Sequence, residues 1–243
     1  MKKIKLFCLP YAGGASHVFL PWKKEIASDI EVIPLELAGR GKRFGEPFYH
    51  SMEHAVEDLY KELDEQLSED SVFAMFGHSM GGLMVYELLI RLKQRKEIKP
   101  IHAFISARYP PHIKKESDRL HELPDDLFIE RIYQLGGTPK EVLENEELLK
   151  LFTPILKNDY RLIHTYQYQG EEERIPCNLS VLNGRDDRNV LMSDVQGWKN
   201  YTDKACTVYE MQGGHFYLHD KEKEVVHFIN QTIRVELEKM VQI

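Results

Sequence analysis

The chain contains the segment Gly77-His78-Ser79-Met80-Gly81, in which a serine stands between two glycines at the spacing G-x-S-x-G. The apolar run before it, residues 72–76, is typical of a strand buried on both faces, and residues 83–92 after it are typical of a helix packed on a sheet. A serine on such a tight strand-to-helix turn projects its hydroxyl away from the backbone, and glycines on either side avoid collisions with the neighbouring elements. The segment therefore predicts a nucleophile elbow with Ser79 as the nucleophile.

A nucleophilic serine needs a base that accepts its proton and a carboxylate that orients the base, and after this elbow the acid precedes the histidine in the chain. Of the eleven histidines, His215 is the one that follows a predicted strand (207–211) and two glycines, at the strand end where α/β sheets gather functional groups. We predict His215 as the base. The predicted strand 178–184 leads to Asp186 and Asp187, and spacing does not choose between these two carboxylates.

A second glycine-bearing turn, residues 10–16, directly follows the first predicted strand. It lacks the lysine of a P-loop and the spacing of a dinucleotide-binding fingerprint, so a phosphate-binding role is disfavoured. An open backbone at this place can direct an N–H at an oxyanion, and we expect Ala12 to supply it. The N–H of Met80, the residue after the nucleophile, is the expected second donor.

The whole chain alternates between strand and helix patterns. Strands are expected at residues 5–9, 30–35, 72–76, 101–106, 178–184 and 207–211, and helices at residues 52–68 (with Ser51 as N-cap), 83–92 and 220–240. This alternation predicts an α/β fold whose mostly parallel sheet is covered by helices on both faces.

Residues 109–169 interrupt the alternation because they show no strand pattern. A helix is expected to begin at Pro124 and to end at Gly136-Gly137, followed by a capping box at 138–141 and a helix from about Asn145 that bends at Pro154. The segment leaves the sheet at its carboxyl end. We therefore expect a helical lid over the site, with an ordinary extra layer of helices as the alternative.

Length and composition fit one enzyme domain spanning residues 1–243. The chain is 42% hydrophobic, and its net charge of −7 disfavours a general nucleic-acid binder. Three cysteines at unrelated spacings predict reduced thiols in a cytoplasmic protein, with no zinc site and no disulfide framework. No apolar run is long enough for a signal peptide or a membrane span, and we expect no metal, cofactor or membrane partner.

Four segments resemble motifs of the type II thioesterases, the free-standing editing hydrolases of nonribosomal peptide and polyketide synthases, and of the related medium-chain thioesterase of animal fatty-acid synthesis. They are residues 9–14 (LPYAGG), 37–47 (LAGRGKRFGEP), 77–82 (GHSMGG) and 213–218 (GGHFYL), and Ala38 is one departure, since the family usually has proline there. The resemblance implies an α/β-hydrolase fold with a helical lid. It also implies that the acid is Asp187, the third residue after the glycine of the N-G-x-D-D turn.

The family's substrates are acyl groups held as thioesters on the phosphopantetheine arm of acyl or peptidyl carrier proteins, and its members are typically monomers. The resemblance thus implies an editing thioesterase with an acyl-serine intermediate, which binds no cofactor of its own. The alternatives are a medium-chain thioesterase of fatty-acid synthesis, a small-molecule carboxylesterase on the same fold, and a carrier-binding module without activity. Fold alone does not decide the reaction.

A carrier protein is typically acidic, as is this chain, so docking calls for a local basic patch near the site. Arg40, Lys42 and Arg43 form the densest cationic cluster near a motif, and we predict that they dock the carrier. Lys114 and Lys115 are the second choice. A solvated loop with incidental charges is the alternative.

Overall fold

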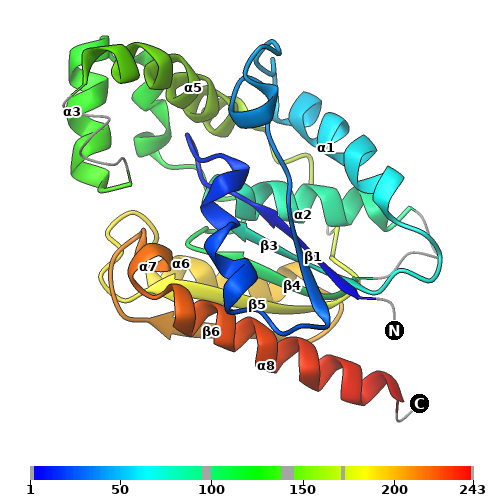
Figure 1. Cartoon of the computed structure of the whole chain (residues 1–243). Helices are drawn as coiled ribbons and strands as arrows, with labels where there is room; N and C mark the ends of the chain where they lie inside the picture. Colours follow the sequence, from blue (N-terminus) through cyan, green and yellow to red (C-terminus); the bar gives the residue numbers. More distant parts are fainter. Residues whose placement is uncertain (1–2, 95–99, 138–144, 171–172, 242–243) are drawn as a thin grey trace.

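The computed structural model describes residues 3–94, 100–137, 145–170 and 173–241, and within them six parallel strands form one sheet. The strand order is β2-β1-β3-β4-β5-β6 (Figure 1). The strands are β1 (Ile4–Leu9), β2 (Ile30–Pro34), β3 (Phe73–His78), β4 (Pro100–Ser106), β5 (Asn178–Gly184) and β6 (Cys206–Met211). Each neighbouring pair is parallel, which confirms the predicted fold class and every predicted strand to within two residues.

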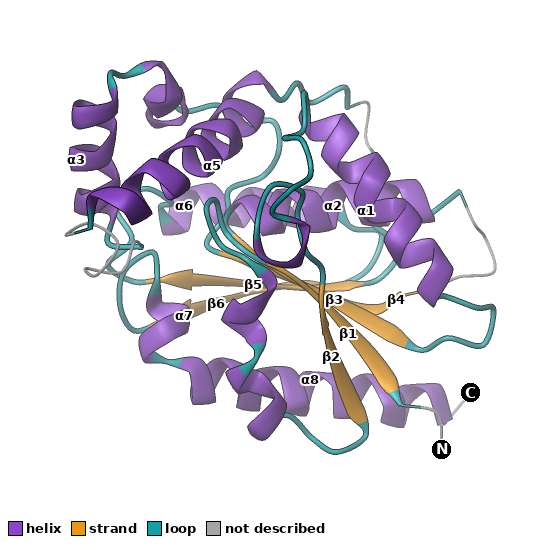
Figure 2. Cartoon of the chain, turned by 45° about the horizontal axis from the view of Figure 1, so that its top comes forward, coloured by secondary structure: helices purple, strands orange, loops and turns teal. Residues whose placement is uncertain are grey.

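Helices cover both faces of the sheet, with α1 and α2 on one face and α8 on the other (Figure 2). The α-helices are α1 (Met52–Gln66), α2 (Met80–Leu92), α3 (Asp125–Leu135), α5 (Glu146–Thr165), α6 (Met192–Val195), α7 (Tyr217–Asp220) and α8 (Glu222–Val241). The 3₁₀ helices are η1 (Ser16–Phe19), η2 (Pro21–Lys24), η3 (Gly41–Arg43), η4 (Glu116–Glu122) and η5 (Gln196–Tyr201). Ser51 caps α1 as predicted, because its side chain accepts the N–H of His54 at 3.1 Å.

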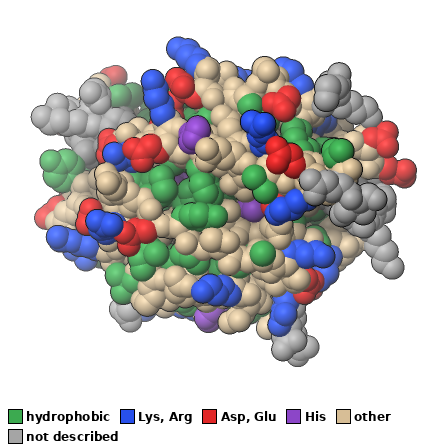
Figure 3. Space-filling view, turned by 90° about the horizontal axis from the view of Figure 1, so that it is seen from below, with side chains coloured by type: hydrophobic (Ala, Val, Ile, Leu, Met, Phe, Trp, Pro, Cys, Tyr) green, Lys and Arg blue, Asp and Glu red, His purple; other side chains and the backbone are tan. Residues whose placement is uncertain are grey.

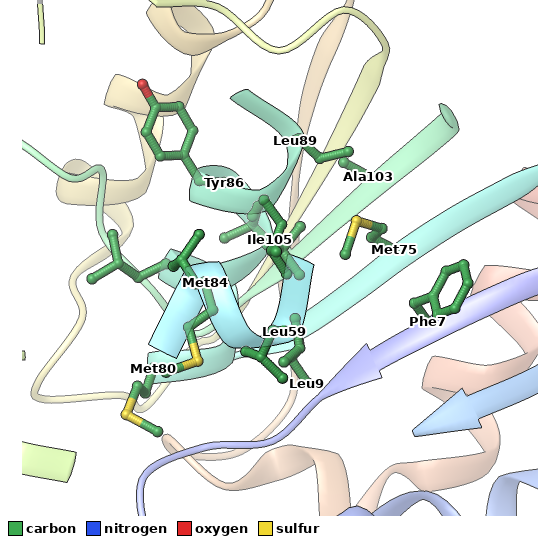
Figure 4. Packing of buried hydrophobic residues seen from close by; sticks show 14 of the residues in the cluster. Phe7, Leu9, Leu59, Met75, Met80, Met84, Tyr86, Leu89, Ala103 and Ile105 are labelled. Carbon is green, nitrogen blue, oxygen red and sulfur yellow. The ribbon is translucent and has the colours of Figure 1, made fainter. Parts of the chain in front are cut away.

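Two apolar clusters hold these layers together. The larger one packs α1 and α2 onto the sheet, and Figure 4 shows members from β1 (Phe7), α1 (Leu59), β3 (Met75), α2 (Leu89) and β4 (Ile105). The second packs α8, η1 and η2 onto the opposite face. The nearly continuous apolar sequence of β3 and β4 follows from this arrangement, since both strands are covered on two sides.

Residues 109–169, named here the helical insertion, contain η4, α3 and α5 between β4 and β5. Glycine ends α3 as predicted, because Gly136 adopts φ +79°, a left-handed conformation that closes a helix well. Asn145 caps α5 by accepting the N–H groups of Glu147 and Leu148. Pro154 lies inside α5, which continues as one helix to Thr165, while the capping box predicted at 138–141 lies outside the described residues.

One face of the molecule carries charged and hydrophobic side chains together. On the face seen in Figure 3, Lys and Arg side chains are interspersed with Asp and Glu, and hydrophobic side chains gather near the centre of the view. None of the helices described is both long and apolar enough to cross a membrane.

Candidate active site

The G-x-S-x-G segment forms a sharp turn between β3 and α2. Ser79 joins the two elements with φ 54° and ψ −114°, a backbone conformation that L-residues seldom adopt. A side chain at Gly77 would place its Cβ 2.1 Å from the carbonyl oxygen of Gly81, and one at Gly81 would lie 2.2 Å from the carbonyl oxygen of Leu9. Only glycine therefore fits at either position, and the predicted elbow geometry is present.

The structure brings Ser79, His215 and Asp187 into one hydrogen-bonded chain. Ser79 Oγ lies 3.0 Å from His215 Nε2, and His215 Nδ1 lies 2.6 Å from Asp187 Oδ2. The other oxygen of Asp187 accepts the N–H groups of Asn189 and Val190 at 2.8 and 3.0 Å, which fixes the orientation of the carboxylate. The carboxyl ends of β3, β5 and β6 supply the three residues.

The two adjacent aspartates at the β5 turn face different surroundings. Asp187 is only 5% exposed and points at the imidazole, whereas Asp186 is exposed and donates its backbone N–H to the Gly213 carbonyl. Asp186 thereby ties the acid turn to the turn that carries His215. The carboxylate that contacts His215 is the one that the family resemblance had selected.

A buried polar network lies behind the nucleophile, and sequence reasoning did not identify it. His78 Nδ1 and Ser106 Oγ are 2.8 Å apart, and Ser106 Oγ is 2.5 Å from the hydroxyl of Tyr217. Complete burial lowers the pKa of the His78 imidazole well below its ordinary value. His78 is therefore neutral and bonded away from Ser79, which leaves His215 as the histidine in contact with the serine.

The two expected oxyanion donors lie at the ends of neighbouring elements. Ala12 lines the cavity that contains Ser79 and His215, and Met80 is the first residue of α2, where N–H groups have no partner within the helix. Among the described residues, neither N–H donates to another protein group. Both are therefore available to a substrate oxygen.

The turn that carries Ala12 is bound to the helical insertion through a buried ion pair. The guanidinium of Arg40 donates to both carboxylate oxygens of Asp159 on α5, each at 2.6 Å. Asp159 also accepts the N–H of Gly13 at 2.7 Å, and Arg40 donates to the carbonyl of Gly14 at 3.2 Å. One carboxylate thus connects α5, the loop after β2 and the turn after β1.

This pair shows that Arg40 does not belong to the predicted docking patch at residues 40–43. Arg40 is 2% exposed and faces inward, so it cannot meet a partner protein. Arg43 is half-buried and donates to Glu46 and Asp58, which leaves Lys42 as the exposed cation of the three. The arginines of this segment hold loops in place.

A cavity of about 60 Å³, named here the Ser79 cavity, lies between the triad residues and the helical insertion. Its lining is largely apolar and includes side chains from η4, α3 and α5. These side chains are Leu120, Leu135, Tyr160 and Ile163, and Val190 and Phe216 face them from the other side. An apolar chain attached to Ser79 would therefore be enclosed by the insertion.

One group with the donor atoms for a metal ion is found within the described residues. His121, Glu122 and His164 place one ligand atom each within 4.8 Å of one another. The group belongs to η4 and α5, and it does not include any of the three residues bonded at Ser79.

Comparison with known proteins places the chain in a family. The thioesterase domain model matches residues 4–233. The linear gramicidin dehydrogenase LgrE of Brevibacillus parabrevis is 35% identical over 96% of this chain and 88% of its own length. The gramicidin S biosynthesis protein GrsT of Aneurinibacillus migulanus is 32% identical over 97% of this chain and 91% of its own length.

Solved structures give the same result. ClbQ, from the colibactin NRPS/PKS pathway, superposes with a TM-score of 0.91 at 35% identity, covering 97% of this chain and 98% of that one. BorB, the type II thioesterase from the borrelidin biosynthetic cluster, superposes with a TM-score of 0.86 at 28% identity, covering 94% and 92%. The chain belongs to the thioesterase family, as a hydrolase of thioesters related to the type II thioesterases of nonribosomal peptide and polyketide pathways.

Proposed function

We propose that this enzyme hydrolyses acyl groups from the phosphopantetheine arm of carrier proteins through a Ser79-His215-Asp187 triad. The observation that carries the proposal is the hydrogen-bonded chain from Ser79 Oγ through the imidazole to a buried carboxylate. Both contacts have the lengths that proton transfer requires.

The first half-reaction acylates the serine. Ser79 Oγ attacks the thioester carbonyl carbon while His215 Nε2 takes the hydroxyl proton, and Asp187 stabilises the imidazolium at Nδ1. The N–H groups of Ala12 and Met80 donate to the oxyanion, and each such donor lowers the barrier by about 3–4 kcal/mol. The C–S bond then breaks, the acyl-serine ester remains, and the sulfur leaves as a thiol after receiving the proton from His215.

The second half-reaction releases the acid. His215 removes a proton from a water molecule, and the oxygen of that water attacks the acyl-serine carbonyl. Collapse of this second tetrahedral intermediate breaks the bond to Ser79 Oγ, which takes the proton back from His215. The products are a free carboxylic acid and the original enzyme. The atoms and electrons of the hydrolysis therefore balance without a metal or redox group.

We propose that the helical insertion acts as the lid of this site. The apolar side chains that η4, α3 and α5 contribute to the Ser79 cavity suit an acyl chain and exclude bulk water from the ester. Acyl preference then depends on these side chains.

The proteins to which this chain is similar favour carrier-bound substrates over free esters. ClbQ comes from the colibactin NRPS/PKS pathway, and in such pathways acyl groups are held on carriers. The medium-chain fatty acid synthase thioesterase of Anas platyrhynchos is 34% identical over 94% of this chain, which keeps fatty acyl carriers as the alternative substrate.

The test compares an acyl-carrier thioester with the oxygen ester of the same acyl group. We expect the thioester to be hydrolysed with the higher kcat/KM, and Ser79→Ala or His215→Ala to lower turnover by about 10⁴–10⁶-fold, because triad members act as a unit. The exposed Ser193→Ala is the matched control and should retain wild-type rates. A preference for the oxygen ester would indicate a carboxylesterase, and near-normal turnover without Ser79 would refute the triad.

A further inference from the structure

Arg108 is a buried cation that packs on an aromatic ring. It follows β4, is 5% exposed, and its guanidinium carbon lies 4.1 Å from the centroid of the Tyr109 ring. Its Nε is buried without a hydrogen bond, and no ion pair to it is found in the part of the chain that the structure describes. A guanidinium does not lose its proton in proteins, and burying it unpaired is costly. An anionic ligand would supply the counter-charge and the hydrogen-bond acceptor that this guanidinium needs.

The backbone before Arg108 is strained in the same way as the nucleophile elbow. Ser79 (φ 54°) and Ala107 (φ 49°) are the non-glycine residues with positive φ among those described. They directly follow β3 and β4, whose last residues pair in register as His78 and Ser106. Strain of this kind persists where function requires a side chain to be aimed. One strained residue is the nucleophile, and the other precedes Arg108.

Arg108 stands between two cavities. With Ile163 it lines both the Ser79 cavity and a neighbouring cavity of about 240 Å³. We name the second one the cationic cavity, because its lining includes Lys114, Lys115 and Arg119 besides Arg108, and no aspartate or glutamate lines it among the side chains that the structure describes.

Two of the four cations are already paired. Lys115 donates to Asp194 at 2.6 Å, and Arg119 contacts Glu122 at 3.1 Å. For Lys114, as for Arg108, no ion pair is found within the described ranges. The charge available to a ligand therefore comes from a buried arginine at the inner end and an exposed lysine at the outer end.

A thioester bound at Ser79 extends in two directions, and the two cavities differ accordingly. The apolar lining of the Ser79 cavity suits the acyl limb, whereas the cationic cavity suits an anion on the thiol limb. Resting on the proposed function, we propose that the cationic cavity binds the phosphate of the phosphopantetheine arm, with Arg108 as its principal ligand. A planar guanidinium matches two phosphate oxygens, and Lys114 adds a second charge at the entrance.

The experiment compares two small substrates with the same acyl group, an acyl-phosphopantetheine and an acyl-pantetheine, so that the phosphate is the sole difference. For the wild-type enzyme we expect kcat/KM to be roughly 10- to 100-fold higher with the phosphate, the range that charge-assisted hydrogen bonds supply. The ratio of kcat/KM for the phosphorylated substrate to kcat/KM for the unphosphorylated one should fall toward 1 in Arg108→Met. It should decrease partially in Arg108→Lys and Lys114→Gln. Lys42→Gln, an exposed lysine outside the cavity, is the matched control and should keep the wild-type ratio.

The outcomes separate this proposal from the proposed function. A wild-type ratio near 1 with both substrates hydrolysed overturns the phosphate site and leaves the thioesterase mechanism intact, whereas hydrolysis of neither substrate counts against the mechanism. A second pair of thioesters, succinyl- and butyryl-pantetheine, tests the other anion that could reach Arg108. If Arg108→Met selectively removes succinyl hydrolysis and leaves the phosphate ratio unchanged, the arginine binds an acyl carboxylate and the proposal fails. Lys114→Gln, at an exposed position, gives the answer even if Arg108→Met does not fold.

Discussion

Removing the carboxylate of Asp159 should destabilise the enzyme far more than an ordinary surface change. In Asp159→Ala the Arg40 guanidinium stays buried at 2% exposure without its two 2.6 Å bonds, and Gly13 loses its acceptor. Breaking one side of a buried ion pair costs about 3–5 kcal/mol, because an uncompensated charge remains inside. With a urea m-value of about 3 kcal/mol/M, the unfolding midpoint should fall by about 1–1.7 M.

Urea denaturation followed by circular dichroism measures this midpoint directly. The double variant Arg40→Met/Asp159→Leu removes both charges at once and should recover most of the lost stability, since well-packed apolar replacements of buried pairs are often neutral. Asp58→Asn is the control, because it removes the Arg43 partner of a pair that is 22% and 31% exposed, and it should cost about 1 kcal/mol or less.

Activity adds a second measurement to the same series. The double variant still lacks the acceptor for the Gly13 N–H, so the turn that carries Ala12 loses a fixed contact and kcat should stay reduced, by up to about 10²-fold if one oxyanion donor is misplaced. Equal, small losses of stability in Asp159→Ala and Asp58→Asn would refute the buried-charge reasoning. A double variant no more stable than Asp159→Ala would refute it as well.

Two further predictions concern the acid and the buried imidazole. Asp187→Asn should lower kcat by about 10⁴-fold whereas Asp186→Asn should change it little, and steady-state kinetics showing the reverse order would contradict the observed contact of Asp187 with His215. For His78, whose pKa is held well below its ordinary value by burial, the unfolded state binds a proton below about pH 6.5 that the folded state does not. The free energy of unfolding should therefore fall by about 1.4 kcal/mol per pH unit on acidification from this group alone. In His78→Gln the measured slope of this free energy against pH should decrease by the contribution of one proton. An unchanged slope would show that His78 is already charged in the folded state.

Much of the fold could be predicted because the spacing of apolar residues along this chain follows which faces of its strands and helices are buried. β3 and β4 are covered on both faces and read as continuous apolar runs, while α1 shows apolar residues at helical spacing with charges between them. Ser79 and His215 could be located for a related reason. Each follows a strand at a glycine-rich turn, and the carboxyl ends of parallel strands meet at one edge of the sheet.

The residues that support the site were less accessible to sequence reasoning. The choice between Asp186 and Asp187 depends on the direction of one turn, which spacing does not encode. Ser106, which is bonded to the buried His78, and Tyr217, which is bonded to Ser106, come from distant elements and carry no local signal. Arg40 was misread for the same reason. Its charge suggested exposure, but its partner Asp159 lies 119 residues later in the chain.

The contacts of α5 divide the helical insertion into a fixed part and a loosely attached part. Asp159 binds the turn after β1, and Arg161 donates to the backbone carbonyls of Tyr49 and His50 at 2.7 and 2.9 Å, so α5 is held to the body of the enzyme. By contrast, α3 meets α5 and η4 through a small apolar cluster that includes Phe128, and the ion pair between Lys157 of α5 and Asp125 of α3 is partly exposed. Because α5 also fixes the turn that carries Ala12, moving it would disturb the oxyanion donor. Because η4 also packs closely against α5, we expect an opening wide enough for an acyl chain to come from α3, while Asp159 keeps the catalytic turn in place.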